Sequence, residues 1–206
     1  MDIFLQYTLV LHILSGYTAL MCGAVAMSTV KGGKRHRKWG LVFYYSMIVV
    51  SATAIVMAFA KNIDFLLYIG IFVLYQNFGG RKALRNKSQI PDIIDWVILA
   101  IAFVNGVAMM YTMEIVLLVF GGITMVLVAT DLRLYIPALR GKKHPPKAWL
   151  SKHIGMMMGA YIGTLTAFLV VNVQFQPHWI VWLGPTIILV PLMRFWTVKY
   201  TKSTVR

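Results

Sequence analysis

Long runs of apolar residues, separated by short polar and basic segments, follow one another along the whole chain. A helix needs roughly 17–25 mostly apolar residues to cross the hydrocarbon core of a bilayer. Stretches that meet or approach this length are Ile3–Thr29, Leu41–Ala60, Phe65–Gly80, Ile93–Thr112, Ile115–Thr130, Ile154–Val173 and Trp179–Val198. The pattern predicts an all-α polytopic integral membrane protein. We expect a bundle of seven transmembrane helices in a single domain over residues 1–206.

The low charge content supports the same class of protein. Only 13% of the 206 residues are charged, whereas about 25% is usual for a soluble domain. Cys22 is the single cysteine, so no disulfide framework is expected.

The distribution of basic residues predicts the orientation of the chain. Lys and Arg number 20, and 19 of them fall in residues 31–38, 81–87, 133–152 and 194–206, which leaves only Lys61 on the other side. Short cytoplasmic loops collect Lys and Arg, so we expect the N-terminus outside and the C-terminus in the cytoplasm. Basic loops beside anionic lipid headgroups explain the net charge of +14. No aromatic and basic groove accompanies the charge, so nucleic-acid binding is not expected.

Ionisable side chains within membrane spans are energetically costly and are therefore candidates for function. In the predicted topology, three of them, Asp95, Asp131 and His153, lie at a similar depth near the cytoplasmic ends of their spans. This placement predicts a polar chamber at the inner leaflet. The candidate ligand or proton site combines the ionisable side chains within or beside the spans: His12, Asp95, Asp131, His153, Arg81 and Arg194.

A purely structural interpretation of the same acids stays open. Asp131 could pair with Arg133, and the acids that open the fourth span could pair with Arg81 or Arg85, so that salt bridges fix the helix ends. An acid at a helix C-terminus is unfavourable for the helix dipole. Asp131, which ends the predicted fifth span, therefore needs a cationic partner, for which His153 is the candidate.

Small residues recur at helical spacing in the first and sixth spans. His12 shares a face with Gly16, Ala19 and Gly23, so it is expected to face protein and not lipid. Gly155, Gly159, Gly163 and Ala167 form a second ladder. Such ladders allow close approach of helices. The Gly155, Gly159 and Gly163 face could also contact a second copy or another membrane protein.

The histidines raise the question of a bound metal or haem. His36, Asp131 and His153 are the only plausible metal ligands on the inner side, and they lack the HxxxH spacing of membrane hydrolases. His12 and His153 lie at different depths and cannot share one haem. The cofactor is therefore left unknown.

Several short motifs occur in a characteristic order. They are His12 with Gly16, Gly33 with His36–Arg37 and Gly40, Arg81 with Leu84–Arg85, Asp95–Trp96, Asp131–Leu132, His153 followed by AYIGTLTAFLVVN, and VWLGPTI. Over nearly its whole length, the chain resembles an uncharacterised bacterial family of predicted multi-span proteins, a domain of unknown function. The resemblance implies a multi-pass protein of the bacterial inner membrane and carries no established reaction.

Three functions remain compatible with these residues. The first is binding or transport of a small molecule or ion through the polar chamber near the cytoplasmic leaflet. The second is a membrane-embedded metal- or haem-dependent enzyme or redox protein. The third is a helper subunit of a membrane complex.

Overall fold

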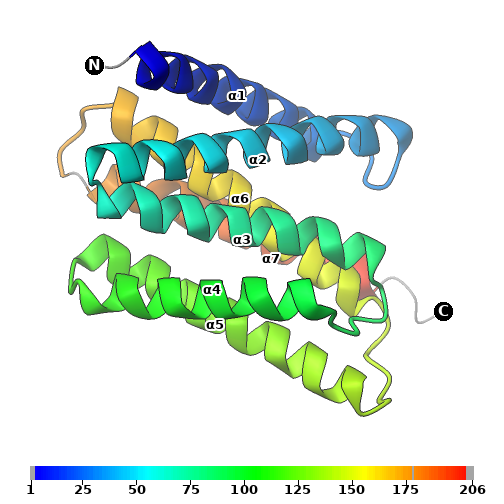
Figure 1. Cartoon of the computed structure of the whole chain (residues 1–206). Helices are drawn as coiled ribbons and strands as arrows, with labels where there is room; N and C mark the ends of the chain where they lie inside the picture. Colours follow the sequence, from blue (N-terminus) through cyan, green and yellow to red (C-terminus); the bar gives the residue numbers. More distant parts are fainter. Residues whose placement is uncertain (1–2, 178, 203–206) are drawn as a thin grey trace. The chain divides into compact units, whose positions relative to one another are not determined.

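The computed structural model describes residues 3–177 and 179–202, and this part of the chain is entirely helical outside its connections (Figure 1). Its helices are α1 (Ile3–Ser28), α2 (Lys34–Lys61), α3 (Asp64–Arg85), α4 (Ile93–Tyr111), α5 (Ile115–Leu139), α6 (Ala148–Asn172) and α7 (Trp179–Lys202). The prediction of an all-α fold is confirmed, and each of the predicted spans coincides with one helix.

Six of these helices are long and apolar enough to cross a membrane, namely α1, α2, α4, α5, α6 and α7. This finding is consistent with a multi-pass membrane protein. The helix outside that set is α3, which carries Gln76, Asn77, Arg81, Lys82 and Arg85. A seventh crossing by α3 therefore stays a prediction.

At their predicted cytoplasmic ends, α5 and α6 extend beyond the apolar stretches from which they were predicted. The helix α5 continues to Leu139, well beyond the predicted end of its span at Thr130. Asp131 consequently lies two turns inside α5 and not at its C-terminus, so the expected conflict with the helix dipole, which is confined to the last turn, does not arise. Likewise α6 begins at Ala148, which places His153 in the second turn. A span predicted from apolar residues ends where polar residues begin, although the hydrogen bonds of the helix continue.

The contacts within the chain form two compact units, and α3, α6 and α7 contribute residues to both. Unit 1 contains residues 1–77 and 159–185. In this unit α1 packs along α2 (Figure 1). Ala19 is fully buried, and a side chain added at Gly23 would collide with Tyr161 and Phe43. The predicted protein-facing side of the first span is confirmed at these positions, whereas Gly16 borders open space.

The small residues of α6 also contact α3 within unit 1. The Gly159 backbone lies directly against the side-chain amide of Gln76, and a Cβ on Gly163 would be 3.0 Å from Val73. Contacts within the chain therefore use both of these glycines. Gly155, the first residue of the predicted ladder, has open space beside it.

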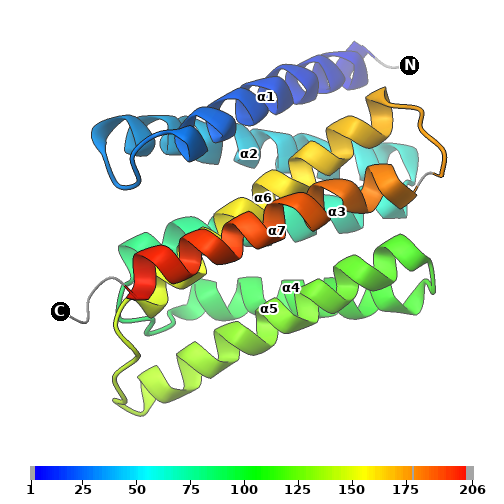
Figure 2. The same cartoon turned by 180° about the vertical axis from the view of Figure 1, so that it is seen from behind.

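Unit 2 contains residues 78–158 and 186–206. Its α4 and α5 pack closely side by side (Figure 2). They approach closely at Gly106 and Gly121, where a Cβ on Gly121 would lie 2.8 Å from the Gly106 carbonyl oxygen. This hairpin holds Asp95 and Asp131 on neighbouring helices.

Large apolar side chains are exposed along several helices. In α1, Tyr7, Leu14 and Met21 recur every seven residues and are 73%, 61% and 68% exposed. Exposed apolar surface on this scale marks contact with a partner or a lipid phase. This exposed apolar surface agrees with helices whose length and composition suit a membrane span.

Candidate ion-pair site

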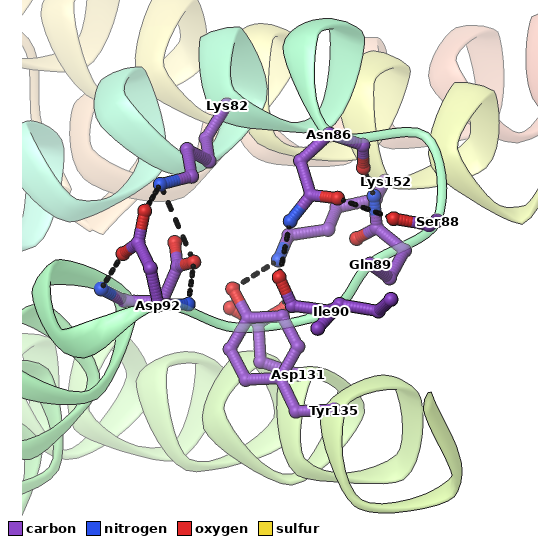
Figure 3. A network of polar contacts seen from close by, with 10 residues as sticks. Lys82, Asn86, Ser88, Gln89, Ile90, Asp92, Asp131, Tyr135 and Lys152 are labelled. Carbon is purple, nitrogen blue, oxygen red and sulfur yellow. Dashed lines mark hydrogen bonds and ion pairs between the residues drawn. The ribbon is translucent and has the colours of Figure 1, made fainter. Parts of the chain in front are cut away.

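The predicted cytoplasmic half of unit 2 holds a group of charged and polar side chains that Figure 3 shows from close by. We call it the charged cluster. Its members come from α3, from the α3–α4 connection, and from α4, α5 and α6: Lys82, Asp92, Asp95, Asp131, Tyr135 and Lys152.

The centre of the charged cluster is an ion pair between α5 and α6. Lys152 Nζ lies 2.8 Å from Asp131 Oδ1, and each side chain is only 3% exposed. Tyr135 follows Asp131 by one helical turn and therefore projects from the same face of α5. Its hydroxyl accepts a hydrogen bond of 2.8 Å from Lys152 Nζ, and the same ammonium lies 4.5 Å from the centre of the Tyr135 ring.

The sequence of α3 explains how α6 comes near enough to supply Lys152. Gly79 and Gly80 stand where a side chain would collide with Met156 and Met157 of α6, including the Met157 backbone nitrogen at 3.1 Å from a Cβ on Gly80. At this close approach, His153 Nδ1 donates a hydrogen bond of 2.8 Å to the Gly80 carbonyl oxygen. His153 is therefore attached to the backbone of α3, while its neighbour Lys152 forms the ion pair with α5.

A second charged group opens α4. The Asp92 carboxylate accepts a hydrogen bond from the Asp95 backbone N–H, and the Asp95 carboxylate accepts one from the Asp92 backbone N–H, which together form a capping box. Lys82 from α3 pairs with Asp92 and lies 3.4 Å from Asp95 Oδ2. The Lys82 ammonium, followed by the Asp95 N–H, holds the pKa of the exposed Asp92 carboxyl below its ordinary value.

The two charged groups are linked by aromatic packing. Trp96, the residue after Asp95, contacts Tyr135 edge to face with 6.1 Å between the ring centres. Asp95 and Asp131 have side chains that are 2% and 3% exposed. Two buried carboxylates, each with a lysine, thus belong to one packed region of unit 2.

The predicted site residues are only partly brought together. Asp95, Asp131 and His153 belong to the predicted cytoplasmic half of unit 2. Arg81 is half-buried in α3, and Arg194 is exposed on α7. His12 belongs to unit 1, where its Nδ1 lies 2.9 Å from Thr53 Oγ1 and 3.1 Å from the Val50 carbonyl oxygen of α2.

The metal candidates are distributed over both units. His36 lies in unit 1, where its Nδ1 donates a hydrogen bond of 2.9 Å to the Ala26 carbonyl oxygen. Asp131 and His153 lie in unit 2. Within residues 3–177 and 179–202, no group of three or more His, Cys, Asp or Glu side chains is placed to hold a metal ion.

Sequence reasoning missed the lysines of the charged cluster. Lys82 and Lys152 counted only as part of the positive charge of cytoplasmic loops, and the arginines were expected to pair with the acids. The position of the acids was the signal that could have indicated these lysines, since a carboxylate inside an apolar helix requires a nearby cation. No family model, curated protein or solved structure was found to match the chain, so the geometry of the site carries the functional interpretation.

Proposed function

We propose that the protein crosses the membrane seven times, with a cytoplasmic C-terminus, and binds or transports a small charged solute or ion at the charged cluster. The basic loops support this orientation. The polar side chains of α3 support its role as the seventh span, because Gln76 and Asn77 are 2% and 0% exposed within the protein. Buried in this way, they add no cost of exposure to lipid.

The observation that carries the proposal is the burial of the Asp131–Lys152 pair. Removing two charges from water costs several kcal/mol for each ion, and apolar residues of similar size often give equal or higher stability. Ionisable residues that persist inside membrane spans commonly mark pathways for ions, protons or substrates. The pair is therefore better explained by function than by stability.

The chemistry of the pair suggests how it would work. A proton or a cation that binds Asp131 releases Lys152, and a solute carboxylate that binds Lys152 releases Asp131. The Tyr135 hydroxyl accepts a hydrogen bond from the ammonium of the intact pair. Exchange of partners at Asp131 would couple the occupancy of the site to its protonation.

Reconstituted vesicles test this proposal directly. Vesicles that contain a pH-sensitive dye and are clamped at zero membrane potential would be exposed in turn to amino acids, mono- and dicarboxylates, sugars, and sodium or potassium salts. We expect at least one class to change the internal pH with the natural protein. Asp131→Asn and Lys152→Gln should abolish that change, whereas Asp64→Asn, at the exposed start of α3, should retain it.

Two outcomes would contradict the proposal. One is an internal pH trace identical to that of protein-free vesicles for every solute class, together with no solute-dependent rise in thermal stability in detergent. The other is a solute response that Asp131→Asn leaves unchanged. We also propose that the protein lies in a bacterial inner membrane, which membrane fractionation tests. We propose further that the Gly155 face makes oligomer contacts, which cross-linking tests.

A further inference from the structure

A separate feature of unit 2 is a cavity of about 510 Å³ between the α3–α4 connection and the α5–α6 connection. Lys87 and Ser88 line it from the first connection. Residues 141–147 line it from the second, and the first turn of α6 completes it. Sites for small molecules commonly measure about 300–1,000 Å³. The cavity is therefore large enough for a phosphorylated headgroup or metabolite and not only for a single ion.

The lining of the cavity has one sign of charge. It includes Lys87, Lys142, Lys143 and Lys147, and the lining residues include no Asp or Glu. Lys142 and Lys143 are exposed at the loop, whereas Lys147 Nζ donates a hydrogen bond of 2.9 Å to the Tyr200 carbonyl oxygen. Clustered lysines with no neighbouring acid favour an anion, and lysine is a common phosphate ligand.

Two further donors point to the same chemistry. His144 lines the cavity, and its buried Nε2 has no hydrogen-bond partner. A buried ring nitrogen without a hydrogen bond is costly, and an oxygen of a phosphate group in the cavity would satisfy it. In addition, α6 begins at Ala148 on the cavity wall. The N-terminus of a long helix presents backbone N–H groups and the positive end of the helix dipole to an anion.

The two connections that form the cavity are locally ordered. Asn86 donates a hydrogen bond of 2.6 Å to the Ile90 carbonyl oxygen and accepts one of 2.8 Å from the Ser88 hydroxyl. Lys87 Nζ lies 4.9 Å from the centre of the Trp149 ring, which joins one connection to the first turn of α6. Gly141 has a φ of +68°, a left-handed conformation that suits glycine at the tight turn after α5.

We infer that this cavity, which we call the lysine pocket, binds a phosphate group, supplied by an anionic phospholipid headgroup or by a soluble phosphate ester. Lys142, Lys143 and His144 are its ligands. The lysine pocket uses no residue of the charged cluster, so this inference stands or falls independently of the proposed function.

Binding measurements on the full chain in zwitterionic detergent test the inference. The probes are inorganic phosphate, glycerol 3-phosphate, short-chain phosphatidylglycerol and, as the neutral reference, short-chain phosphatidylcholine. We expect saturable binding of at least one phosphate probe with a net negative charge and none of phosphatidylcholine. Binding of the soluble probes shows that the phosphate group alone suffices, whereas binding of phosphatidylglycerol alone identifies a lipid site.

A charge-matched control separates the lysine pocket from general surface charge. The variant Lys142→Gln/Lys143→Gln should weaken binding by at least about tenfold, because it removes two charged donors to the phosphate oxygens. Lys34→Gln/Lys38→Gln removes the same charge from exposed positions of α2 and should change the dissociation constant less than twofold. Thermal unfolding without probe verifies that both variants are folded.

His144→Leu provides a second variant for the same site. It keeps both lysines and should still weaken binding severalfold, because the buried ring nitrogen is lost. The inference is overturned if no anionic probe binds the natural protein, if the two double-lysine variants lose the same affinity, or if His144→Leu and Lys142→Gln/Lys143→Gln both bind normally.

Discussion

The buried pair of Asp131 and Lys152 gives the sharpest prediction about stability. Lys152→Met removes the ammonium and leaves a carboxylate that is 3% exposed without its ion-pair partner at 2.8 Å. At an effective dielectric constant of about 20, two unit charges at this distance attract each other by ~6 kcal/mol. Several kcal/mol of desolvation for each ion offset most of this attraction. The pair as a whole should therefore contribute little net stability, although each partner depends strongly on the other.

The expected result follows from that balance. Lys152→Met and Asp131→Leu should each lower the free energy of unfolding by about 3–5 kcal/mol, and the double variant should recover most of the loss. Unfolding in detergent micelles, followed by circular dichroism for all four proteins, gives a double-mutant cycle. The expected coupling is at least about 4 kcal/mol, because the two single losses sum to about 6–10 kcal/mol and the double variant loses much less. A second cycle, with a substitution at His153 instead of the one at Lys152, tests the predicted coupling of His153 and Asp131.

Two exposed residues provide the control for this cycle. Lys61 and Asp64 are close in sequence and opposite in charge, and both are exposed. Lys61→Met and Asp64→Leu should couple by less than about 0.5 kcal/mol, as exposed pairs do. Additive effects at Asp131 and Lys152, or a double variant no more stable than the single ones, would refute the reasoning.

Two further predictions concern helix packing and pH. Gly121→Ala should lower stability by about 1–3 kcal/mol because the new Cβ lies 2.8 Å from the Gly106 carbonyl oxygen and 2.7 Å from Met110 Cγ. Gly122→Ala, one residue further, meets open space and should be neutral or slightly stabilising in the same thermal assay; equal effects at both would contradict the packing of α4 on α5. The pKa of Asp92 is lowered from 3.8 by Lys82 and the Asp95 N–H, so its contribution to stability is present above that value and is lost as the pH falls through the lowered folded pKa. Asp92→Asn keeps a good helix cap but should flatten the dependence of stability on pH below about 4, and an unchanged acid limb of the stability curve would contradict the pairing with Lys82.

The helices and the faces of small residues could be predicted from the sequence because both depend on local pattern. The apolar windows identified every helix, and the spacing of Ala19 and Gly23 identified the protein-facing side of α1. Helix ends were less predictable. Residues 131–139 continue α5 after the predicted apolar stretch ends, which places Asp131 inside the helix.

The partners in the charged cluster were not predictable, because they depend on which helices pack together. Arg133 is two residues from Asp131 in α5, and side chains at this separation do not face each other in a helix. Lys152 reaches Asp131 from α6, an approach that depends on Gly79 and Gly80 of α3. A single sequence shows the need for a cation at Asp131 without showing which helix supplies it.

The seven-span topology depends most directly on α3, the helix outside the set that is long and apolar enough to cross a membrane. Reporters for cytoplasmic or external location would be inserted after Asn62, between α2 and α3, and after Lys87, between α3 and α4. If α3 crosses the membrane, the insertion after Asn62 reports the outside and the insertion after Lys87 reports the cytoplasm. Reports from the same side would show that α3 does not cross, and the placement of the charged cluster at the cytoplasmic ends of the spans would be wrong.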